Sequence, residues 1–322
     1  MTDYRRAGVD LAGAERHVKA IGAAVTSTWG AEVVGGFGGF AAGIRIPPAY
    51  RDPILMLTTD GVGTKLELAR QANRWDGVGS DLVAMVVDDL AAVGARPVAV
   101  VDYMAVGRLH PERDTAIVES IAAACQEAEA ALLGGETAEH PGVMEPDQVD
   151  LAATALGVVE DGAALSADRV RIGDVIVGLR SPNLRSNGFS LVRSIVAGRD
   201  LDEEVGAHSL AEVLLAPSVI YSPAVQVALA KCEIHAAVHV TGGGMPGNLP
   251  RSLPAGSSYE LSRWEVPPIF GLLAQWGEIS DDVMAAAFNL GIGFCLICPP
   301  SEADTVVDLA GHEAQVIGKV TG

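Results

Sequence analysis

The segment Thr59-Asp60-Gly61-Val62-Gly63-Thr64-Lys65 decides how the first half of this chain folds. It follows an apolar run at residues 54–57 and precedes a helical pattern, so the sequence predicts a strand, a tight turn and a helix. The N–H groups of such a turn would face an anion at the helix N-terminus, and Lys65 would add positive charge. The spacing is neither that of a Walker A motif nor that of the dinucleotide fingerprint. An ordinary turn with a surface lysine is the competing interpretation.

Four aspartates could supply oxygen ligands to a metal ion beside this turn. Asp60 ends the strand, and a helix predicted over residues 81–93 carries Asp81, Asp88 and Asp89 on its polar face. Asp81 and Asp88 are two turns apart, so both point the same way, about 10.5 Å from each other along the axis. Carboxylates suit Mg²⁺ when it bridges polyphosphate oxygens. The alternative is that these are solvated acids, because the chain has 41 acidic residues.

A second glycine turn follows a predicted helix at residues 114–130 and a short strand at 131–133. It contains Gly134, Gly135 and Glu136, and we interpret Glu136 as a contact to metal or ribose, with a helix-capping acid as the alternative. Residues 1–45 are predicted to be irregular and rich in glycine. A strand over 149–159 and a polar stretch at 160–173 place a domain boundary near residue 165, giving domains 1–165 and 166–322.

The second domain shows the same pattern, in which a predicted strand is followed by a glycine-containing turn. Ser186-Asn187-Gly188 precedes a helix and is either an N-cap or a phosphate cradle. His239 lies just before three consecutive glycines and is either a packed structural histidine or a ligand-contacting one.

Composition limits the class of protein. A length of 322 residues with 49% hydrophobic but only 5% aromatic content and 37 glycines favours a two-domain α/β enzyme. The net charge of -19 argues against nucleic acid as a partner. The sequence contains no uninterrupted apolar run of about 18 residues, so no membrane-spanning helix is predicted. Four scattered cysteines indicate reduced thiols in the cytoplasm. Cys295 and Cys298 fall on a predicted strand and would face opposite sides.

Many ordered blocks of the sequence resemble the aminoimidazole ribonucleotide synthetase family of cyclo-ligases. Its wider relatives include formylglycinamidine synthetase, selenophosphate synthetase, thiamine-monophosphate kinase and a hydrogenase maturation protein. The blocks are YRRAGVD (4–10), GGFGGF (35–40), TDGVGTK (59–65), DLVAM (81–85), GGETAEHP (134–141), SNGFSLVR (186–193), LLAPSVIY (214–221), HVTGGG (239–244) and FNLGIG (288–293).

This resemblance implies a two-domain PurM-like α/β fold whose N-terminal sheets pair across a homodimer. It implies ATP and Mg²⁺ as cofactors and a small phosphorylated substrate bound between the domains. The implied reaction is phosphorylation of the formyl oxygen of formylglycinamidine ribonucleotide, followed by closure of the imidazole ring in purine biosynthesis.

The resemblance also implies roles for particular residues. Catalysis would involve Lys65, His239 and Arg185, and the metal ligands would be Asp60, Asp81, Asp88 and Asp89. Nucleotide contacts would come from Gly61, Val62, Gly63, Thr64, Lys65, Gly135, Glu136 and Thr137. Substrate contacts would come from Ser186, Asn187 and Gly243.

Two positions depart from the family pattern. The family commonly has His-Ser-Asn-Gly where this chain has Arg185-Ser186-Asn187-Gly188, and Asn-Asp where it has Asp88-Asp89. Aspartate keeps an oxygen ligand, but a permanently charged arginine cannot shuttle protons. Two interpretations of Arg185 therefore stay open. It could bind the phosphate group of the substrate, or it could mark a relative of the family that activates a related amidine with ATP. A non-catalytic nucleotide-binding dimer is the alternative outside enzymes.

Overall fold

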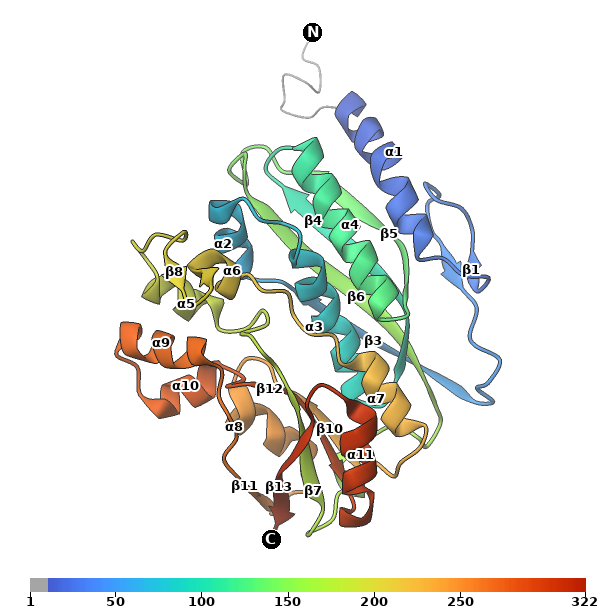
Figure 1. The fold of residues 1–322 in the computed structure, drawn as a ribbon. Coiled ribbons are helices and arrows are strands. Elements are labelled where there is room, and N and C mark those ends of the chain that lie inside the picture. The colour runs from blue at the N-terminus through green and yellow to red at the C-terminus, as the bar shows by residue number, and fades with distance from the viewer. Residues whose placement is uncertain (1–10) are drawn as a thin grey trace.

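A computed structural model describes residues 11–322, so the YRRAGVD block lies outside the described residues. The chain folds into two halves, each built on one sheet (Figure 1). No helix within residues 11–322 has the length and apolar character needed to cross a membrane. The elements of the first half are α1 (Leu11–Ser27), β1 (Val33–Val34), β2 (Gly43–Ile44), β3 (Pro53–Gly61), α2 (Lys65–Ala72), α3 (Val78–Ala92), β4 (Arg96–Val106), α4 (Pro111–Glu127), β5 (Ala131–Glu139) and β6 (Val149–Glu160).

The elements of the second half follow a short 3-10 turn, η1 (Ala167–Arg169). They are β7 (Val175–Arg180), α5 (Phe189–Ile195), β8 (Glu204–Val205), β9 (His208–Ser209), α6 (Leu210–Leu214), α7 (Ser222–Leu229), β10 (Ala236–His239), α8 (Gly244–Asn248), η2 (Leu249–Ser252), β11 (Ser258–Leu261), α9 (Pro268–Gly277), α10 (Asp281–Ala287), β12 (Ile292–Cys298), η3 (Pro300–Glu302), α11 (Ala303–Ala310) and β13 (Gln315–Thr321).

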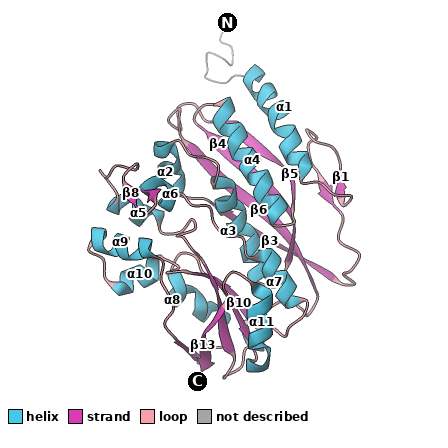
Figure 2. Cartoon of the chain, viewed as in Figure 1, coloured by secondary structure: helices cyan, strands magenta, loops and turns pink. Residues whose placement is uncertain are grey.

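The N-terminal sheet has the strand order β3-β6-β4-β5, and only β4 and β5 run parallel. Helices α3 and α4 lie over one face of it (Figure 2), while α1 packs on α4 and β5. On the other face of the sheet, Leu55, Leu57, Val101 and Tyr103 are exposed. One face of this sheet is therefore covered within the chain, and the other presents large apolar side chains to solvent.

The C-terminal sheet is antiparallel throughout, in the order β10-β12-β7-β13-β11. A different apolar cluster covers each face, one including α7 and α11 and the other α8 and η2. Cys295 belongs to one cluster and Cys298 to the other, which confirms that these thiols face opposite sides of the strand. All four cysteines are free.

Helix α3 lies between the two halves, which also meet where α7 packs on β4 and α2 on α5. It packs on β3, β4, β6 and α4 of the first half, and on α7 and β10 of the second (Figure 1). Its predicted polar face is not solvated, because the side chains of Asp81 and Asp88 are 1% and 0% exposed. The alternative interpretation of solvated acids is therefore wrong for these two residues, since that face meets the second half of the chain.

The mixed α/β fold with two domains is confirmed, with three local corrections. Residues 11–27 form helix α1 rather than an irregular segment, because Ile21 and Val25 pack on the core although alanine and glycine dilute the apolar stripe. Strand β5 continues to Glu139 by pairing with β4, so Glu136 lies within a strand and not in a turn. The helix predicted at 114–130 spans Pro111–Glu127. The boundary near residue 165 stays a prediction.

Close packing of α3 on α4 depends on Gly79. A Cβ atom at this position would lie 2.1 Å from the main-chain carbon of Ser120, so Gly79→Ala must push the helices apart and should cost about 2–3 kcal/mol. Gly271, in the exposed part of α9, has nothing within 4 Å of the same atom, so Gly271→Ala should gain about 0.5–1 kcal/mol. Urea unfolding of both variants checks this, and midpoints that move in the same direction would contradict it.

Candidate functional site

A buried ion pair between Lys65 and Asp81 joins the two halves. The Lys65 Nζ atom lies 2.8 Å from Oδ1 and 2.7 Å from Oδ2 of Asp81, and it donates to the carbonyl oxygens of Arg185 and Ala216. The main-chain N–H and the hydroxyl of Ser218 donate to the same Asp81 carboxylate. Lys65 thus uses its three donors inside the protein. Direct contact of Lys65 with a phosphate, or of Asp81 with a metal ion, would require this pair to open.

Asp88 and Arg185 form a second buried ion pair, two turns along α3 from the first. The Nη2 atom of Arg185 lies 2.5 Å from Oδ2 of Asp88, and both side chains are 0% exposed. The main-chain N–H groups of Tyr221 and Ser222 donate to Oδ1 of Asp88, each at 2.9 Å. Both oxygens of Asp88 therefore accept hydrogen bonds from the second half of the chain, and Arg185 does not face solvent.

Asp89 is the acid of α3 that remains accessible, with 40% of its side chain exposed. Its Oδ1 atom is 2.8 Å from Nδ1 of His239, and its Oδ2 atom accepts a hydrogen bond from the Thr58 hydroxyl at 3.2 Å. Burial alone would raise the pKa of Asp89, but the hydrogen bonds from His239 and Thr58 outweigh it and hold the pKa below its ordinary value. Asp89 is therefore a carboxylate at neutral pH.

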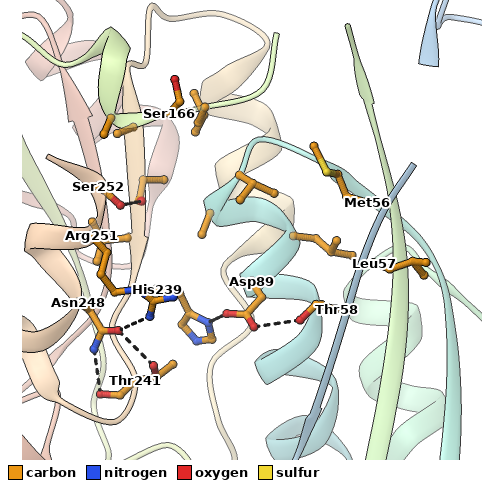
Figure 3. A pocket seen from close by; sticks show the side chains of 18 residues that line it. Met56, Leu57, Thr58, Asp89, Ser166, His239, Thr241, Asn248, Arg251 and Ser252 are labelled. Atoms are coloured by element: carbon orange, nitrogen blue, oxygen red, sulfur yellow. Dashed lines mark hydrogen bonds and ion pairs between the residues drawn. The ribbon is translucent and has the colours of Figure 1, made fainter. Parts of the chain in front are cut away.

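Asp89 and His239 point toward one another in a cavity of about 440 Å³ between the halves (Figure 3). Arg251 of η2 lies on the same wall as His239, across from Asp89, and donates to the Oδ1 atom of Asn248 at 3.2 Å. The polar lining also includes Thr58, Ser166, Thr241 and Ser252. Sequence reasoning missed Thr58, Asn248 and Arg251, because nothing in their local sequence distinguishes them from ordinary strand and helix residues.

The end of strand β3 leaves a second acid accessible. Asp60 is exposed, and its Oδ1 atom accepts the N–H of Gly61 at 2.7 Å. Thr58 and Asp60 are two residues apart on one strand, so their side chains point to the same face, and Thr58 contacts Asp89. Asp60 and Asp89 are thus two accessible carboxylates on the side of the sheet that faces α3.

Residues Val62 to Thr64 complete the turn between β3 and α2. Val62 is buried, and Gly63 has a φ of +71°, which favours glycine. The Thr64 hydroxyl lies 3.2 Å from the hydroxyl of Ser190 in α5. The turn therefore sits where the first half meets the second, and helix α2 begins at Lys65 as predicted.

Two loops of the second half meet through Asn187. Its Oδ1 atom accepts the N–H of Gly242 at 3.1 Å, and its Nδ2 atom lies 3.6 Å from the sulfur of Met85 in α3. Gly243 has a φ of +95°. The hydroxyl of Ser186 is buried without a hydrogen-bond partner in the described part of the chain. The structure thus brings Asn187 and the glycine turn together, next to α3.

The predicted nucleotide residues Gly135, Glu136 and Thr137 line a different cavity, of about 610 Å³. Its walls are α1, strands β4 and β5, and the glycine-rich segment 36–42. The His17 Nε2 atom is 3.4 Å from the Thr137 hydroxyl, whereas its buried Nδ1 atom has no partner in the described residues. The structure does not bring these residues into the lining of the interdomain cavity.

Asp102 lines this second cavity, and burial raises its pKa to about 7. A folded-state pKa above the unfolded value means that the folded protein keeps a proton that the unfolded chain releases above about pH 4. Stability is therefore lost as pH rises from about 4 to about 7. Asp102→Asn should remove this loss, so the variant should gain on the order of 2 kcal/mol more at pH 8 than at pH 5. Urea titrations at both pH values check this, and an equal gain at both would contradict it.

The donor set suits a metal ion that is shared with a ligand. Among residues 11–322, no three or more His, Cys, Asp or Glu side chains form a group that could hold a metal ion. Mg²⁺ commonly binds one or two carboxylates and completes its shell with water and phosphate oxygens. Asp60 and Asp89, both accessible, fit that requirement, whereas Asp81 and Asp88 are already surrounded by donors from the protein.

The fold and the interdomain arrangement define a class of two-domain proteins. Thiamine-monophosphate kinase from Stenotrophomonas maltophilia K279a has a similar fold, with a TM-score of 0.68 and 21% identity over 96% of this chain and 93% of that chain. Hydrogenase maturation protein HypE in complex with ATP aligns with a TM-score of 0.57 and 15% identity over 95% of this chain and 84% of that chain. At such identities these likenesses concern the fold.

Sequence comparison identifies the family. The family models for AIR synthase related protein match residues 38–159 with the N-terminal domain and residues 171–322 with the C-terminal domain. A phosphoribosylformylglycinamidine cyclo-ligase of Thermosynechococcus vestitus is 46% identical, over 99% of this chain and 96% of the relative. The chain belongs to the AIR synthase related family.

Proposed function

We propose that this chain catalyses the ATP-dependent conversion of formylglycinamidine ribonucleotide to aminoimidazole ribonucleotide, ADP and phosphate, a step of purine biosynthesis. The observation that carries this proposal is the near full-length identity of 46% to a curated cyclo-ligase. Departures at Arg185 and Asp88 do not remove the accessible acids of the site, because Asp60 and Asp89 are retained. A cytoplasmic location fits the four free thiols.

The chemistry divides into two steps. The formyl oxygen of the substrate attacks the γ-phosphorus of ATP, so a P–O bond forms as the bond to ADP breaks. The ribose-bearing nitrogen then attacks the formyl carbon, a C–N bond closes the ring, and the C–O bond breaks to release phosphate with loss of a proton from nitrogen. Phosphorylation turns a poor leaving oxygen into a good one, so positioning and charge stabilisation matter more than side-chain acid–base work.

Asp60 and Asp89 would hold the magnesium ion, which supplies positive charge against the triphosphate in a protein with a net charge of -19. The N–H groups of Gly61, Val62, Gly63 and Thr64 would bind phosphate oxygens at the start of α2. Lys65 and Asp81, paired to each other, would hold that turn against the second half of the chain. Gly135, Glu136 and Thr137 would contact the nucleotide in the cavity beside α1. The structural relative solved with ATP supports nucleotide binding by this fold.

The substrate would lie in the interdomain cavity. His239, Asp89 and Thr241 line it, and Asn187 accepts the N–H of Gly242, the residue after Thr241. Ser186, Asn187 and Gly243 would contact the substrate from these adjoining loops. The unpartnered Ser186 hydroxyl is a polar group that a ligand could satisfy. The cavity volume of about 440 Å³ is within the range of sites for small molecules.

A homodimer would form through the uncovered face of the N-terminal sheet. Leu57 is 70% exposed there, and Leu55, Val101 and Tyr103 are 50%, 42% and 43% exposed. These side chains come from β3 and β4, which lie on either side of β6 in one sheet. Large apolar side chains exposed on one face mark an interaction site on a protein of otherwise acidic character. Pairing with the same face of a second copy would bury it.

Incubation of the purified protein with ATP, Mg²⁺ and formylglycinamidine ribonucleotide tests the function. We expect aminoimidazole ribonucleotide and ADP to appear in equal amounts. ATP consumption without that product would favour a relative that activates another amidine. Absence of both products at every enzyme concentration would refute the proposal in favour of a non-catalytic nucleotide-binding dimer.

A further inference from the structure

Arg185 has an uncommon backbone conformation that directs its side chain inward. Its φ is +59°, in the left-handed region that residues other than glycine seldom occupy. The loop is held there because the Arg185 N–H donates to Oδ1 of Asn183 at 2.9 Å and its carbonyl accepts from Lys65 at 3.0 Å. The guanidinium group is consequently fully buried between the halves, beside the ring of Tyr221.

The hydrogen bonds of this guanidinium group determine where the proton of His239 lies. Nη1 of Arg185 is 2.7 Å from Nε2 of His239. A guanidinium group has only donors and stays charged, so Nε2 must be the acceptor and carries no proton. The neutral imidazole then carries its proton on Nδ1, which is 2.8 Å from the Oδ1 atom of Asp89 and donates to it. Each ring nitrogen of His239 therefore has one defined partner and neither is free.

The result is a row of groups with alternating donors and acceptors. It runs from the Asp88 carboxylate through the Arg185 guanidinium and the neutral His239 ring to the Asp89 carboxylate. Asp88 cannot turn away, because two main-chain N–H groups bind its other oxygen. The first three members are buried, and the row ends at the side chain that is 40% exposed in the interdomain cavity.

We propose that Arg185 is a positioning residue: it fixes His239 in the tautomer protonated on Nδ1, and through that N–H it fixes the orientation of the Asp89 carboxylate in the interdomain cavity. His239 then presents no free nitrogen to the substrate, so it acts through Asp89 and does not itself accept a proton. The role of Arg185 in catalysis rests on the proposed function. The assignment of the His239 tautomer does not depend on that function.

The tautomer can be read directly in the native protein. We expect two-bond ¹H–¹⁵N correlation spectra of the full-length, ¹⁵N-histidine-labelled protein at neutral pH to show His239 with a protonated Nδ1 and an unprotonated Nε2. The signals are assigned by their loss in His239→Gln. A proton on Nε2, or on both nitrogens, would overturn the proposal, and this measurement needs no folded Arg185 variant.

A double variant tests whether the tautomer matters. Arg185→Met alone leaves Asp88 buried without its cation, so Arg185→Met with Asp88→Asn removes both charges and keeps an acceptor for the Tyr221 and Ser222 N–H groups. We expect His239 to gain a proton on Nε2 in some or all molecules. We also expect kcat to fall about 10- to 100-fold, the usual cost of losing a group that orients a ligand-binding side chain.

The matched control neutralises another arginine–carboxylate pair of the second half. Arg199 lies 2.9 Å from Glu203, and both side chains are 32% exposed, so Arg199→Met with Glu203→Gln should leave both the His239 spectrum and kcat unchanged. A switched tautomer with wild-type kcat, or an unchanged tautomer in the Arg185 variant, would overturn the positioning role. Absence of any cyclo-ligase product from the native protein would refute the proposed function and leave the tautomer result standing.

Discussion

Lys65→Met is expected to lower the free energy of unfolding by about 3–5 kcal/mol. The variant leaves the Asp81 carboxylate buried at 1% exposure with the Ser218 donors but without its cation. It also removes the hydrogen bonds from Lys65 to the carbonyl oxygens of Arg185 and Ala216, which tie the second half to the first. Urea unfolding followed by circular dichroism measures the loss.

Two variants show whether the buried charge is the cause. Lys319→Met breaks an exposed pair with Glu260 and should cost less than about 1 kcal/mol. Lys65→Met combined with Asp81→Asn removes both buried charges and keeps an oxygen that accepts from Ser218, so it should regain most of the lost stability. A double variant no more stable than Lys65→Met would show that the Lys65 contacts to carbonyl oxygens, and not the unpaired charge, dominate.

Asp60→Asn is expected to lower kcat for ring closure about 10²- to 10³-fold and to raise the Mg²⁺ concentration needed for half-maximal rate. Asp60 is exposed, and its carboxylate accepts a hydrogen bond from the N–H of the next residue, so an amide of equal size should leave the unfolding midpoint almost unchanged. Rates of aminoimidazole product formation across a Mg²⁺ titration give both quantities.

Asp161 provides the control for Asp60, since it is also an exposed aspartate next to a strand of the N-terminal sheet but lies after β6. Asp161→Asn should have wild-type rates at every Mg²⁺ concentration. If Asp60→Asn behaves in the same way as Asp161→Asn, then Asp60 does not take part in holding the ion.

The local sequence was enough to predict the strand, turn and helix around Asp60 and Lys65. Apolar runs marked β3 and β7, and glycines marked the turns that follow. Helix α1 escaped prediction because its apolar residues are separated by alanine and glycine, and its packing partner α4 is about a hundred residues away in the chain. Local patterns determine local structure, and long-range contacts have no local signature.

The environment of the charged residues could not be predicted for the same reason. The spacing of Asp81 and Asp88 correctly predicted that they share one face of α3. It could not predict that the second half of the chain covers this face. Lys65 is 16 positions from Asp81, and Arg185 is 97 positions from Asp88. Only the fold reveals that two of the four acids are paired inside the protein and that Asp60 and Asp89 remain accessible.

Calorimetric titration of ATP into the purified protein, with and without Mg²⁺, tests most directly whether this acidic chain holds a triphosphate through a magnesium ion at Asp60 and Asp89. We predict binding that requires Mg²⁺ and that is weakened in Asp60→Asn but not in Asp161→Asn. ATP binding of equal strength in the absence of Mg²⁺, or no binding in its presence, would contradict the account.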